Sequence, residues 1–275
     1  MTDPFRDFEH EGWERVARAY AEAFPGLTGQ FGERLLDAMA LGEGMLLLDV
    51  ASGPGVVTRA AARRGARAVG LDFSAAMVEV ARATNPGVEF REGDAQALPF
   101  ATATFDRVVM NFGVLHLSDP DRAFVEARRV LRPGGRYGFT VWAAHERNRG
   151  MGIVAEAVER YGQPATGIPA GPDRLRFARE AECRRALTAA GFDPATVSFT
   201  THDVRWLAPT ATYLVDVQRD AAVRTAATLR QQSPEHLDRI RAAVAREVAA
   251  YRVDGGFAVP MSAHVVSAAV PAASA

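Results

Sequence analysis

The stretch Leu46–Thr58, LLLDVASGPGVVT, constrains the fold of this chain more than any other segment of its 275 residues. Its opening apolar run predicts a strand buried on both faces of a parallel sheet. Asp49 places a carboxylate at the end of that strand, and Gly53 and Gly55 allow a tight turn before a helix. Because ligands of open α/β sheets bind beyond the carboxyl ends of the strands, this turn is predicted to bind a ligand.

The turn departs from the dinucleotide-binding pattern G-x-G-x-x-G. Gly53 and Gly55 supply the first two glycines, but Thr58 stands where the third belongs. Asp49 would also place a negative charge close to a pyrophosphate, and an acid suits a cationic ligand better. A nicotinamide-dependent oxidoreductase is therefore a less favoured alternative.

Apolar strands alternate with helical segments from residue 45 to 143, which predicts a doubly wound parallel sheet. The predicted strands of this region are 45–50, 68–72, 88–91, 105–111 and 136–142. Its predicted helices are 55–64, 74–83 and a segment opened by Asp119-Pro120 and closed by Pro133-Gly134-Gly135. Outside it, helices are predicted at 11–24, 31–40, 150–161, 179–190 and across 210–252, and strands at 196–206 and 257–269.

Further polar groups stand where predicted strands end, and each has a role if the ligand carries a nucleoside. Asp72 ends the second strand, where a carboxylate can accept hydrogen bonds from both ribose hydroxyls. Phe73 can then lie against the base, and Asp94, after the third strand, can accept from an exocyclic amino group. The stretch 111–117 (NFGVLHL) follows the fourth strand.

These stretches, in this order and at these intervals, resemble the motifs of the class I S-adenosylmethionine (SAM)-dependent methyltransferases. The segments 98–100 (LPF) and 131–135 (LRPGG) agree with the same pattern. The resemblance covers roughly residues 45–143 and is closest to the small-molecule enzymes related to the ubiquinone/menaquinone C-methyltransferases. Ala51 departs from the family, which most often has its first glycine there.

The resemblance implies an α/β fold with a seven-stranded, mostly parallel Rossmann-like sheet, an antiparallel last strand and a helical cap. It implies SAM as cofactor, S-adenosylhomocysteine (SAH) as product, and methyl transfer to O, N or C of a small organic metabolite by in-line displacement. The residues expected to bind the cofactor are Asp49, Ala51, Gly53, Gly55, Asp72, Phe73, Met77, Asp94, Ala95, Asn111 and Phe112.

The chain is expected to divide into a SAM-binding core and the segments that cover it. The predicted parts are lid helices (1–44), the core (45–143), a first cap insertion (144–180), a core helix and strand (181–209), a second helical cap insertion (210–254) and the last strand with its tail (255–275). The two insertions would lie at the mouth of the site and determine substrate specificity.

Histidines and aromatic residues supply the candidates for catalysis and substrate binding. His116, after the fourth strand, and His145, after the fifth, are candidate bases, although His116 can equally be a structural residue of the cofactor pocket. The candidate substrate contacts, which can alternatively be packing residues, are Trp13, Tyr20, Trp142, Phe177 and Tyr213.

Composition favours some partners and excludes others. A net charge of −1 argues against nucleic acid, and the single cysteine excludes an internal disulfide and a cysteine-rich metal site. No metal is expected. Without an apolar leader or a membrane span, the chain is expected to be cytoplasmic, and its oligomeric state is open, with a homodimer as one alternative. A protein that uses SAM structurally or for another reaction, or an enzyme acting on RNA or protein, are further alternatives.

Overall fold

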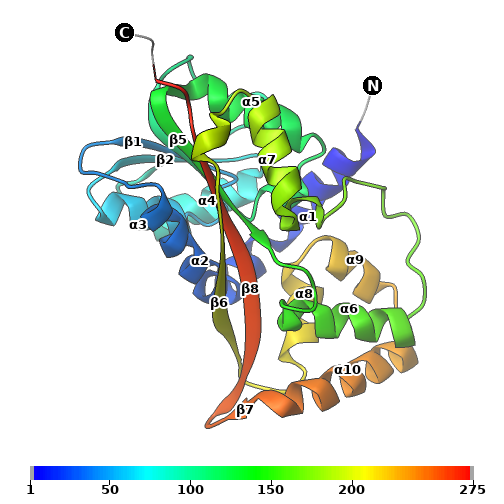
Figure 1. Ribbon diagram of the computed structural model, residues 1–275. Helices are drawn as coiled ribbons and strands as arrows, with labels where there is room; N and C mark the ends of the chain where they lie inside the picture. The colour runs from blue at the N-terminus through cyan, green and yellow to red at the C-terminus, as the bar shows by residue number, and fades with distance from the viewer. Residues whose placement is uncertain (1–2, 273–275) are drawn as a thin grey trace.

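The structure, a computed structural model, describes residues 3–272 and is built on one large sheet (Figure 1). The strand order is β3-β2-β1-β4-β5-β8-β6, and the short β7 pairs with β8. The strands are β1 (Leu46–Val50), β2 (Arg67–Asp72), β3 (Glu89–Glu92), β4 (Phe105–Asn111), β5 (Leu131–Trp142), β6 (Ser198–Ala208), β7 (Arg252–Val253) and β8 (Gly256–Ala269).

The first five strands of the sheet are parallel, and the last ones are antiparallel. β1 pairs with β2 and β4, β3 with β2, and β5 with β4, all in parallel register. β8 runs antiparallel between β5 and β6. The carboxyl ends of β1 to β5 therefore share one edge. The predicted fold class is confirmed, with the two-residue β7 as an addition to the expected seven strands.

Helices cover both faces of the sheet. They are α1 (Pro4–Ala23), α2 (Pro25–Ala38), α3 (Val56–Arg63), α4 (Ala75–Thr84), α5 (Pro120–Val130) and α7 (Glu180–Ala189). Alternation along β1 separates the two sides: Leu47 packs in the cluster that includes α2 and α3, whereas Leu48 packs in the cluster that includes α5 and α7. Because helices pack on both faces of the sheet at β1, consecutive residues of this strand are apolar.

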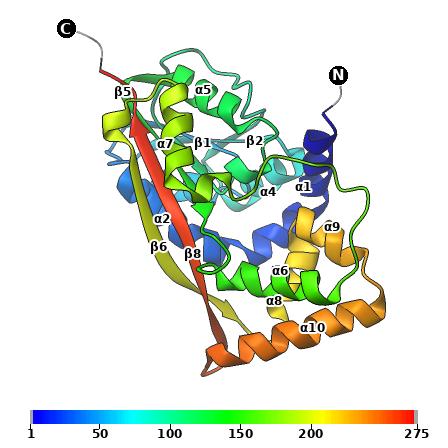
Figure 2. The same ribbon diagram turned by 45° about the vertical axis from the view of Figure 1, so that its right-hand side comes forward.

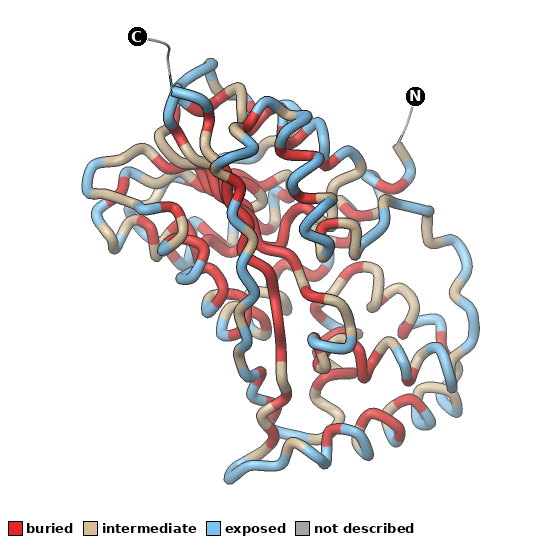
Figure 3. The backbone as a smooth tube through the Cα atoms, viewed as in Figure 1, coloured by how far each residue is buried: buried red, intermediate tan, exposed pale blue. Residues whose placement is uncertain are grey.

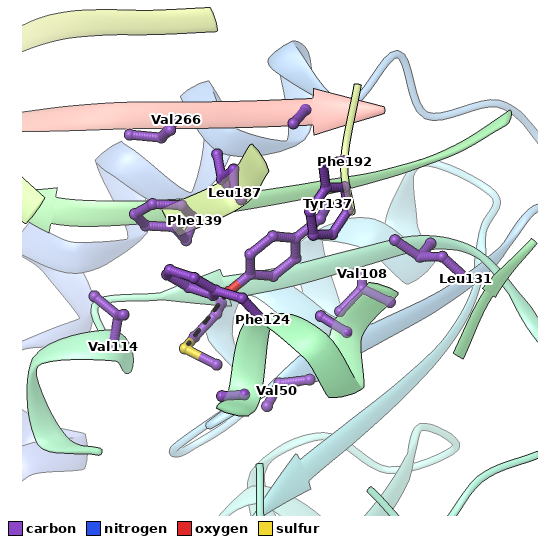
Figure 4. Packing of buried hydrophobic residues seen from close by; sticks show 14 of the residues in the cluster. Val50, Val108, Val114, Phe124, Leu131, Tyr137, Phe139, Leu187, Phe192 and Val266 are labelled. Atoms are coloured by element: carbon purple, nitrogen blue, oxygen red, sulfur yellow. Dashed lines mark hydrogen bonds between the residues drawn. The ribbon is translucent and has the colours of Figure 1, made fainter. Parts of the chain in front are cut away.

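The core on the α5 and α7 side is rich in aromatic rings (Figure 4). Phe124 of α5 lies 5.2 Å from Phe139 of β5, and Tyr137 lies 5.7 Å from Phe192. The central strands and most of β8 are buried along their length (Figure 3). The strand ends that carry the site are therefore held by a closely packed support.

A group of four helices packs beside the far end of the long strands β6 and β8 (Figure 2). It consists of α6 (Arg149–Tyr161), α8 (Tyr213–Ala221), α9 (Arg224–Arg230) and α10 (Pro234–Val248). Val154, Leu214, Val244 and Val259 belong to one buried cluster that joins these helices to β8. The predicted cap segments thus share one apolar core, although the six-part division of the chain remains a prediction.

Several element boundaries differ from the predicted ones, and for three of them the local structure gives the reason. α1 begins at Pro4 instead of residue 11, because the Asp3 carboxylate accepts hydrogen bonds from the amides of Phe5 and Arg6 and caps the helix. Pro25, predicted only to stop the first helix, is the first residue of α2. β5 begins at Leu131, which pairs with Phe105, so the PGG stretch lies within the strand instead of closing a helix.

No helix within residues 3–272 combines the length and the apolar character that crossing a bilayer requires. Of the predicted tail, residues 271 and 272 have no regular secondary structure, and residues 273–275 lie outside the described part of the chain.

Candidate active site

The turn after β1 is built by three residues in the left-handed region. Ala51, Gly53 and Gly55 have φ angles of 54°, 51° and 80°. Asp72, at the end of β2, accepts a hydrogen bond from the Gly53 amide at 2.8 Å and one from the Ser74 amide at 3.0 Å. The carboxylate thereby fixes the turn against β2. A left-handed alanine costs about 1–2 kcal/mol, so Ala51 holds a conformation that glycine would adopt more easily.

Asp49 lies beneath this turn as a buried carboxyl group with one free oxygen. Thr58 donates its hydroxyl to Oδ2 at 2.7 Å, and Oδ1 has no partner. Burial raises the pKa of Asp49 to about 7, and the charge of Asp72 adds to the effect. A cationic group at Oδ1 would favour the ionised form. The Ser52 hydroxyl is also buried without a partner.

A cavity of about 430 Å³ opens at the carboxyl ends of the strands. The predicted cofactor residues that line it are Ala51, Gly53, Asp72, Phe73, Met77, Asp94, Ala95, Asn111 and Phe112. Asp49 lines a smaller adjoining cavity, whose walls include Tyr20, Thr28 and Gly53 as well. Gly55 lines neither cavity; its position is a packing site against Phe90. Burial raises the pKa of Asp72 to about 6.

The end of β4 is held by a chain of hydrogen bonds that crosses the sheet. Thr140 of β5 donates to Oδ1 of Asn111 at 2.7 Å and accepts from the Phe112 amide at 2.9 Å. Asn111 in turn donates to the carbonyl of Thr28 in α2 at 3.2 Å. Phe112 has a φ of 59° and stacks on Trp142, with 3.8 Å between ring centroids. The two rings form a fixed aromatic wall.

The cavity's other wall contains a buried polar cluster around Glu9 of α1. Glu9 is fully buried, and its Oε2 lies 2.8 Å from Nδ1 of His116 in the short helix η1 (Val114–His116). The Trp13 indole donates to the same oxygen at 3.2 Å. Arg224 of α9 places Nε 2.8 Å from Oε1 and also donates to the carbonyl of Leu115.

Charges and burial in this cluster keep His116 neutral and Glu9 ionised. Burial lowers the pKa of His116, and the positive charges of Arg224 and Arg174 lower it further, although Glu9 opposes them. Burial opposes ionisation of Glu9, but His116 and the arginines lower the pKa of Glu9 overall. With Glu9 as acceptor, the proton of the neutral imidazole lies on Nδ1, so Nε2 keeps its lone pair.

The predicted catalytic and substrate residues divide into two groups. His116, His145, Trp13, Tyr20 and Trp142 line the cavity. Phe177 does not: it is 4% exposed and packs 5.2 Å from Phe124 and 6.0 Å from Phe139 in the core. Tyr213 does not either, and its ring lies edge-on to Trp206. The structure therefore does not bring these two residues to the cavity: Phe177 is buried in the core, and Tyr213 is a half-buried residue of α8 that packs on Trp206.

Several cavity residues were missed by the sequence reasoning. They are Arg6, Thr28, Asn148, Arg174, Gln218 and Arg224. Asn148 is fully buried, and neither of its side-chain polar atoms has a partner. One sequence signal was available but incomplete: Glu9 and Trp13 are four residues apart, the spacing of one helix face, but the predicted helix began only at residue 11 and left Glu9 outside it. The arginines gave no such signal, because all 32 basic residues of the chain are arginine.

The sheet order and the place of the cavity define the class of protein: a Rossmann-like α/β protein whose main cavity lies at the carboxyl ends of parallel strands. Comparison with known proteins narrows the class. The family model described as a methyltransferase domain matches residues 48–139.

Relatives with curated names agree with this match. A demethylmenaquinone methyltransferase of Renibacterium salmoninarum is 39% identical over 111 residues, covering 40% of this chain and 47% of the relative. The corresponding enzyme of Beutenbergia cavernae is 34% identical over 168 residues, covering 56% of this chain and 70% of the relative. This chain therefore belongs to the family of class I SAM-dependent methyltransferases. It spans about half the length of the Renibacterium relative.

A solved structure shows the same fold across nearly the whole chain. Phosphoethanolamine N-methyltransferase 2 of Haemonchus contortus, in complex with SAM, has a TM-score of 0.58 and 18% identity. The match covers 98% of this chain and 60% of that one. The likeness extends the shared fold to the cap helices and β8, beyond the residues of the family match.

Proposed function

We propose that this protein transfers a methyl group from SAM to an O, N or C atom of a small organic metabolite. One observation carries the proposal: a single cavity joins the strand-end residues Asp72, Asp94 and Asn111 to an aromatic region that contains His116. A cofactor and an acceptor can therefore meet in one enclosed space. The menaquinone relatives, named for methyl transfer to a small molecule, support the proposal.

The residues present fit SAM. The unpartnered Oδ1 of Asp49 and the cavity at Gly53 suit the cationic methionine end, and the buried Asp72 suits the ribose hydroxyls. Asp94 and Ala95 line the cavity where the base would lie, although Asp94 also pairs with Arg6 at 2.9 Å. The Haemonchus contortus neighbour is named as a complex with SAM, which supports the same cofactor here.

SAM supplies a methyl group already activated on a sulfonium, so transfer to a nucleophile is an in-line displacement. The protein's task is then to align the acceptor and keep water out. The stacked Phe112 and Trp142 form a rigid wall for this purpose, and α1 covers the cavity with Trp13 and Tyr20. In well-oriented reactions, fixed orientation can supply up to roughly 7–11 kcal/mol of the barrier reduction.

His116 is the best-placed residue to take a proton from the acceptor. Its Nδ1 is engaged by Glu9, and its low pKa keeps Nε2 free to accept a proton at neutral pH. A base oriented by a carboxylate is a recurrent arrangement in acid–base catalysis. His145, which also lines the cavity, is the second candidate.

Thermal unfolding with and without SAH tests the cofactor, with NAD⁺ as the control. A ligand at about 100 times its dissociation constant adds roughly 2.7 kcal/mol to the free energy of unfolding if it does not bind the unfolded chain. We expect SAH to raise the melting temperature by several degrees and NAD⁺ to leave it unchanged. The SAH shift should disappear in Asp72→Ala, because the ribose loses its acceptor and the Gly53 turn loses the carboxylate that fixes it.

The outcomes separate the competing functions. A rise with NAD⁺ and none with SAH would replace the proposal by an oxidoreductase. A rise with SAH, but no SAH formed from SAM with any nucleophile of a broad panel, would favour a protein that uses SAM without methyl transfer. Binding of RNA at low salt would favour a nucleic-acid substrate, which the net charge of −1 argues against.

A further inference from the structure

One arginine at the cavity wall lacks the carboxylate partner that its neighbours have. Arg174 lies in the connection 162–175 between α6 and the short helix η2 (Arg176–Ala178), and it lines the cavity. Arg176 pairs with Asp121 at 2.6 Å, and Arg179 pairs with Asp173 at 2.9 Å. Arg174 forms no ion pair with an acidic side chain in the part of the chain that the structure describes.

The charges around Arg174 leave one positive charge uncompensated. Glu9 is the carboxylate of this wall, and Arg224 already occupies it at 2.8 Å. His116 is neutral, and Asp173 is taken by Arg179. Arg174 is exposed to solvent at one side, but its position in the cavity wall desolvates the guanidinium and lowers its pKa to about 10; Arg224 contributes to the decrease, and Glu9 opposes it. Arg174 therefore stays protonated at neutral pH.

The fold holds this arginine at the cavity by several contacts along its connection. Gln232 of the α9–α10 turn accepts from the Gln163 amide at 2.6 Å and donates to the Gln163 carbonyl at 3.0 Å. At the other end, Gly171 passes so close to Phe5 of α1 that a Cβ there would lie 2.2 Å from the ring. The connection is therefore held at Gln163 and again at Gly171, three residues before Arg174.

We propose that Arg174 binds an anionic group of the methyl acceptor, so that the substrate is an organic anion with an apolar body. The inference rests on the proposed function and assigns the substrate class for the same site. A guanidinium presents two parallel N–H donors to a carboxylate, and such charge-assisted pairs are among the stronger hydrogen bonds. The aromatic wall of Phe112 and Trp142 receives the apolar part.

The carboxylate of the cofactor is a less suitable partner for Arg174. The methionine end is assigned to the small cavity at the glycine turn, which is lined by Asp49, Ser52 and Thr28. Arg174 lines the large cavity but not the small one. Arg174 belongs to the same cavity wall as His116, the proposed base. The acceptor must lie beside that base, so the charge of Arg174 lies close to the acceptor.

Calorimetric titration of SAH-saturated protein with a charged and a neutral probe of the same shape tests the proposal. The probes are 2-naphthoate and 2-naphthamide. We expect wild type to bind 2-naphthoate at least about tenfold more tightly than 2-naphthamide. Arg174→Gln should bring the ratio of the two affinities to about one. Arg184→Gln, which removes an exposed arginine of α7 that pairs with Glu180 and does not line the cavity, should keep the wild-type ratio.

Other results would overturn the proposal. The first is that wild type, titrated up to millimolar probe, binds 2-naphthoate no more tightly than 2-naphthamide. The second is that Arg174→Gln keeps the preference for 2-naphthoate. The third is that Arg174→Gln weakens the affinity for SAH, which would assign the residue to the cofactor. Melting curves check folding, and Arg174→Gln should not lower the melting temperature, because no ion pair is lost. If wild type prefers naphthoate but does not bind SAH, the anion site stands and the proposed function fails.

Discussion

Glu9 and His116 are 107 residues apart in the chain, and their side chains meet at 2.8 Å inside the cavity wall. Glu9 comes from the first helix and His116 from the turn after β4. The pair therefore forms only when α1 lies over the carboxyl edge of the sheet. This relationship couples closure of the cavity by α1 to the orientation of the proposed base.

Replacing His116 tests its role as the base. We expect His116→Gln to lower kcat by a factor of about 10²–10⁴, the contribution of a positioned acid or base, while the affinity for SAH is unchanged. SAH release from SAM with an acceptor that wild type methylates measures the rate. His145→Gln serves as the matched comparison. If His145→Gln carries the loss and His116→Gln does not, the two assignments are reversed.

The pH dependence of kcat gives an independent check. Because the pKa of His116 lies below its ordinary value of 6.5, the neutral base persists into mildly acidic solution, and the rate should fall only below pH 6.5. Glu9 raises the pKa of His116, so Glu9→Gln should move this acid limb to still lower pH. A limb at or above pH 6.5 in wild type, or one unmoved in Glu9→Gln, would contradict the assignment.

Stability should depend strongly on Glu9. Glu9→Gln leaves Arg224, whose side chain is 11% exposed, without its carboxylate. Breaking a buried ion pair from one side costs about 3–5 kcal/mol, so the urea midpoint should fall markedly. Glu11→Gln, on the exposed side of the same helix, is the control and should stay within about 0.5 kcal/mol. Equal effects of the two variants would show that Glu9 is not structurally coupled to Arg224.

Cofactor binding should release protons from Asp49 and Asp72. Burial raises their pKa values to about 7 and about 6, so both are partly protonated in mildly acidic solution. A cationic amine and hydroxyl donors favour the ionised carboxylates, so affinity for SAH should increase as pH rises through these values and then level off. Calorimetry in two buffers of different ionisation enthalpy counts the protons. Asp49→Asn should remove the part of the proton release that comes from Asp49. An affinity for SAH that decreases as the pH rises from about 6 to about 7 would contradict the assignment.

Sequence reasoning predicted the parallel core because the local patterns there have a direct physical meaning. The apolar run of β1, buried on both faces, indicated the centre of the sheet, and Asp72 and Asn111 followed from their places at strand ends. Gly55 shows the limit of the same reasoning. A glycine in a ligand-binding turn suggests contact with the ligand, whereas here it makes room for Phe90.

The residues that sequence reasoning missed depend on long-range packing. Arg174 lines the cavity because the 162–175 connection is anchored to Phe5 and Gln232, and nothing in its local pattern distinguishes it from Arg176 or Arg179. Phe177, in contrast, is an aromatic residue in a segment predicted to lie at the mouth of the site, but it is buried against α5 and β5. The packing of the cap against the core determines whether Arg174 and Phe177 reach the cavity, and no short sequence motif predicts that packing.

The packing role of Gly55 leads to a test of the turn itself. A Cβ at Gly55 would lie 2.5 Å from Cζ of Phe90 and 2.9 Å from Nδ2 of Asn85, and the backbone has a φ of 80°. Gly55→Ala should therefore pay a left-handed strain of about 1–2 kcal/mol and a further overpacking cost of about 1–3 kcal/mol. Gly87→Ala provides a matched control, because Gly87 has a φ of 85° and nothing within 4 Å of its Cβ position.

The difference between the two variants in urea denaturation isolates the overpacking cost. We expect Gly55→Ala to be the less stable by about 1–3 kcal/mol. Asn85 donates to the carbonyl of Pro54 at 3.0 Å, so displacing Asn85 also disturbs the turn and should weaken SAH binding. Gly87→Ala should keep the wild-type affinity. If both variants lose equal stability, the turn relaxes around the methyl group, and the close contact with Phe90 is not what holds the cofactor loop in place.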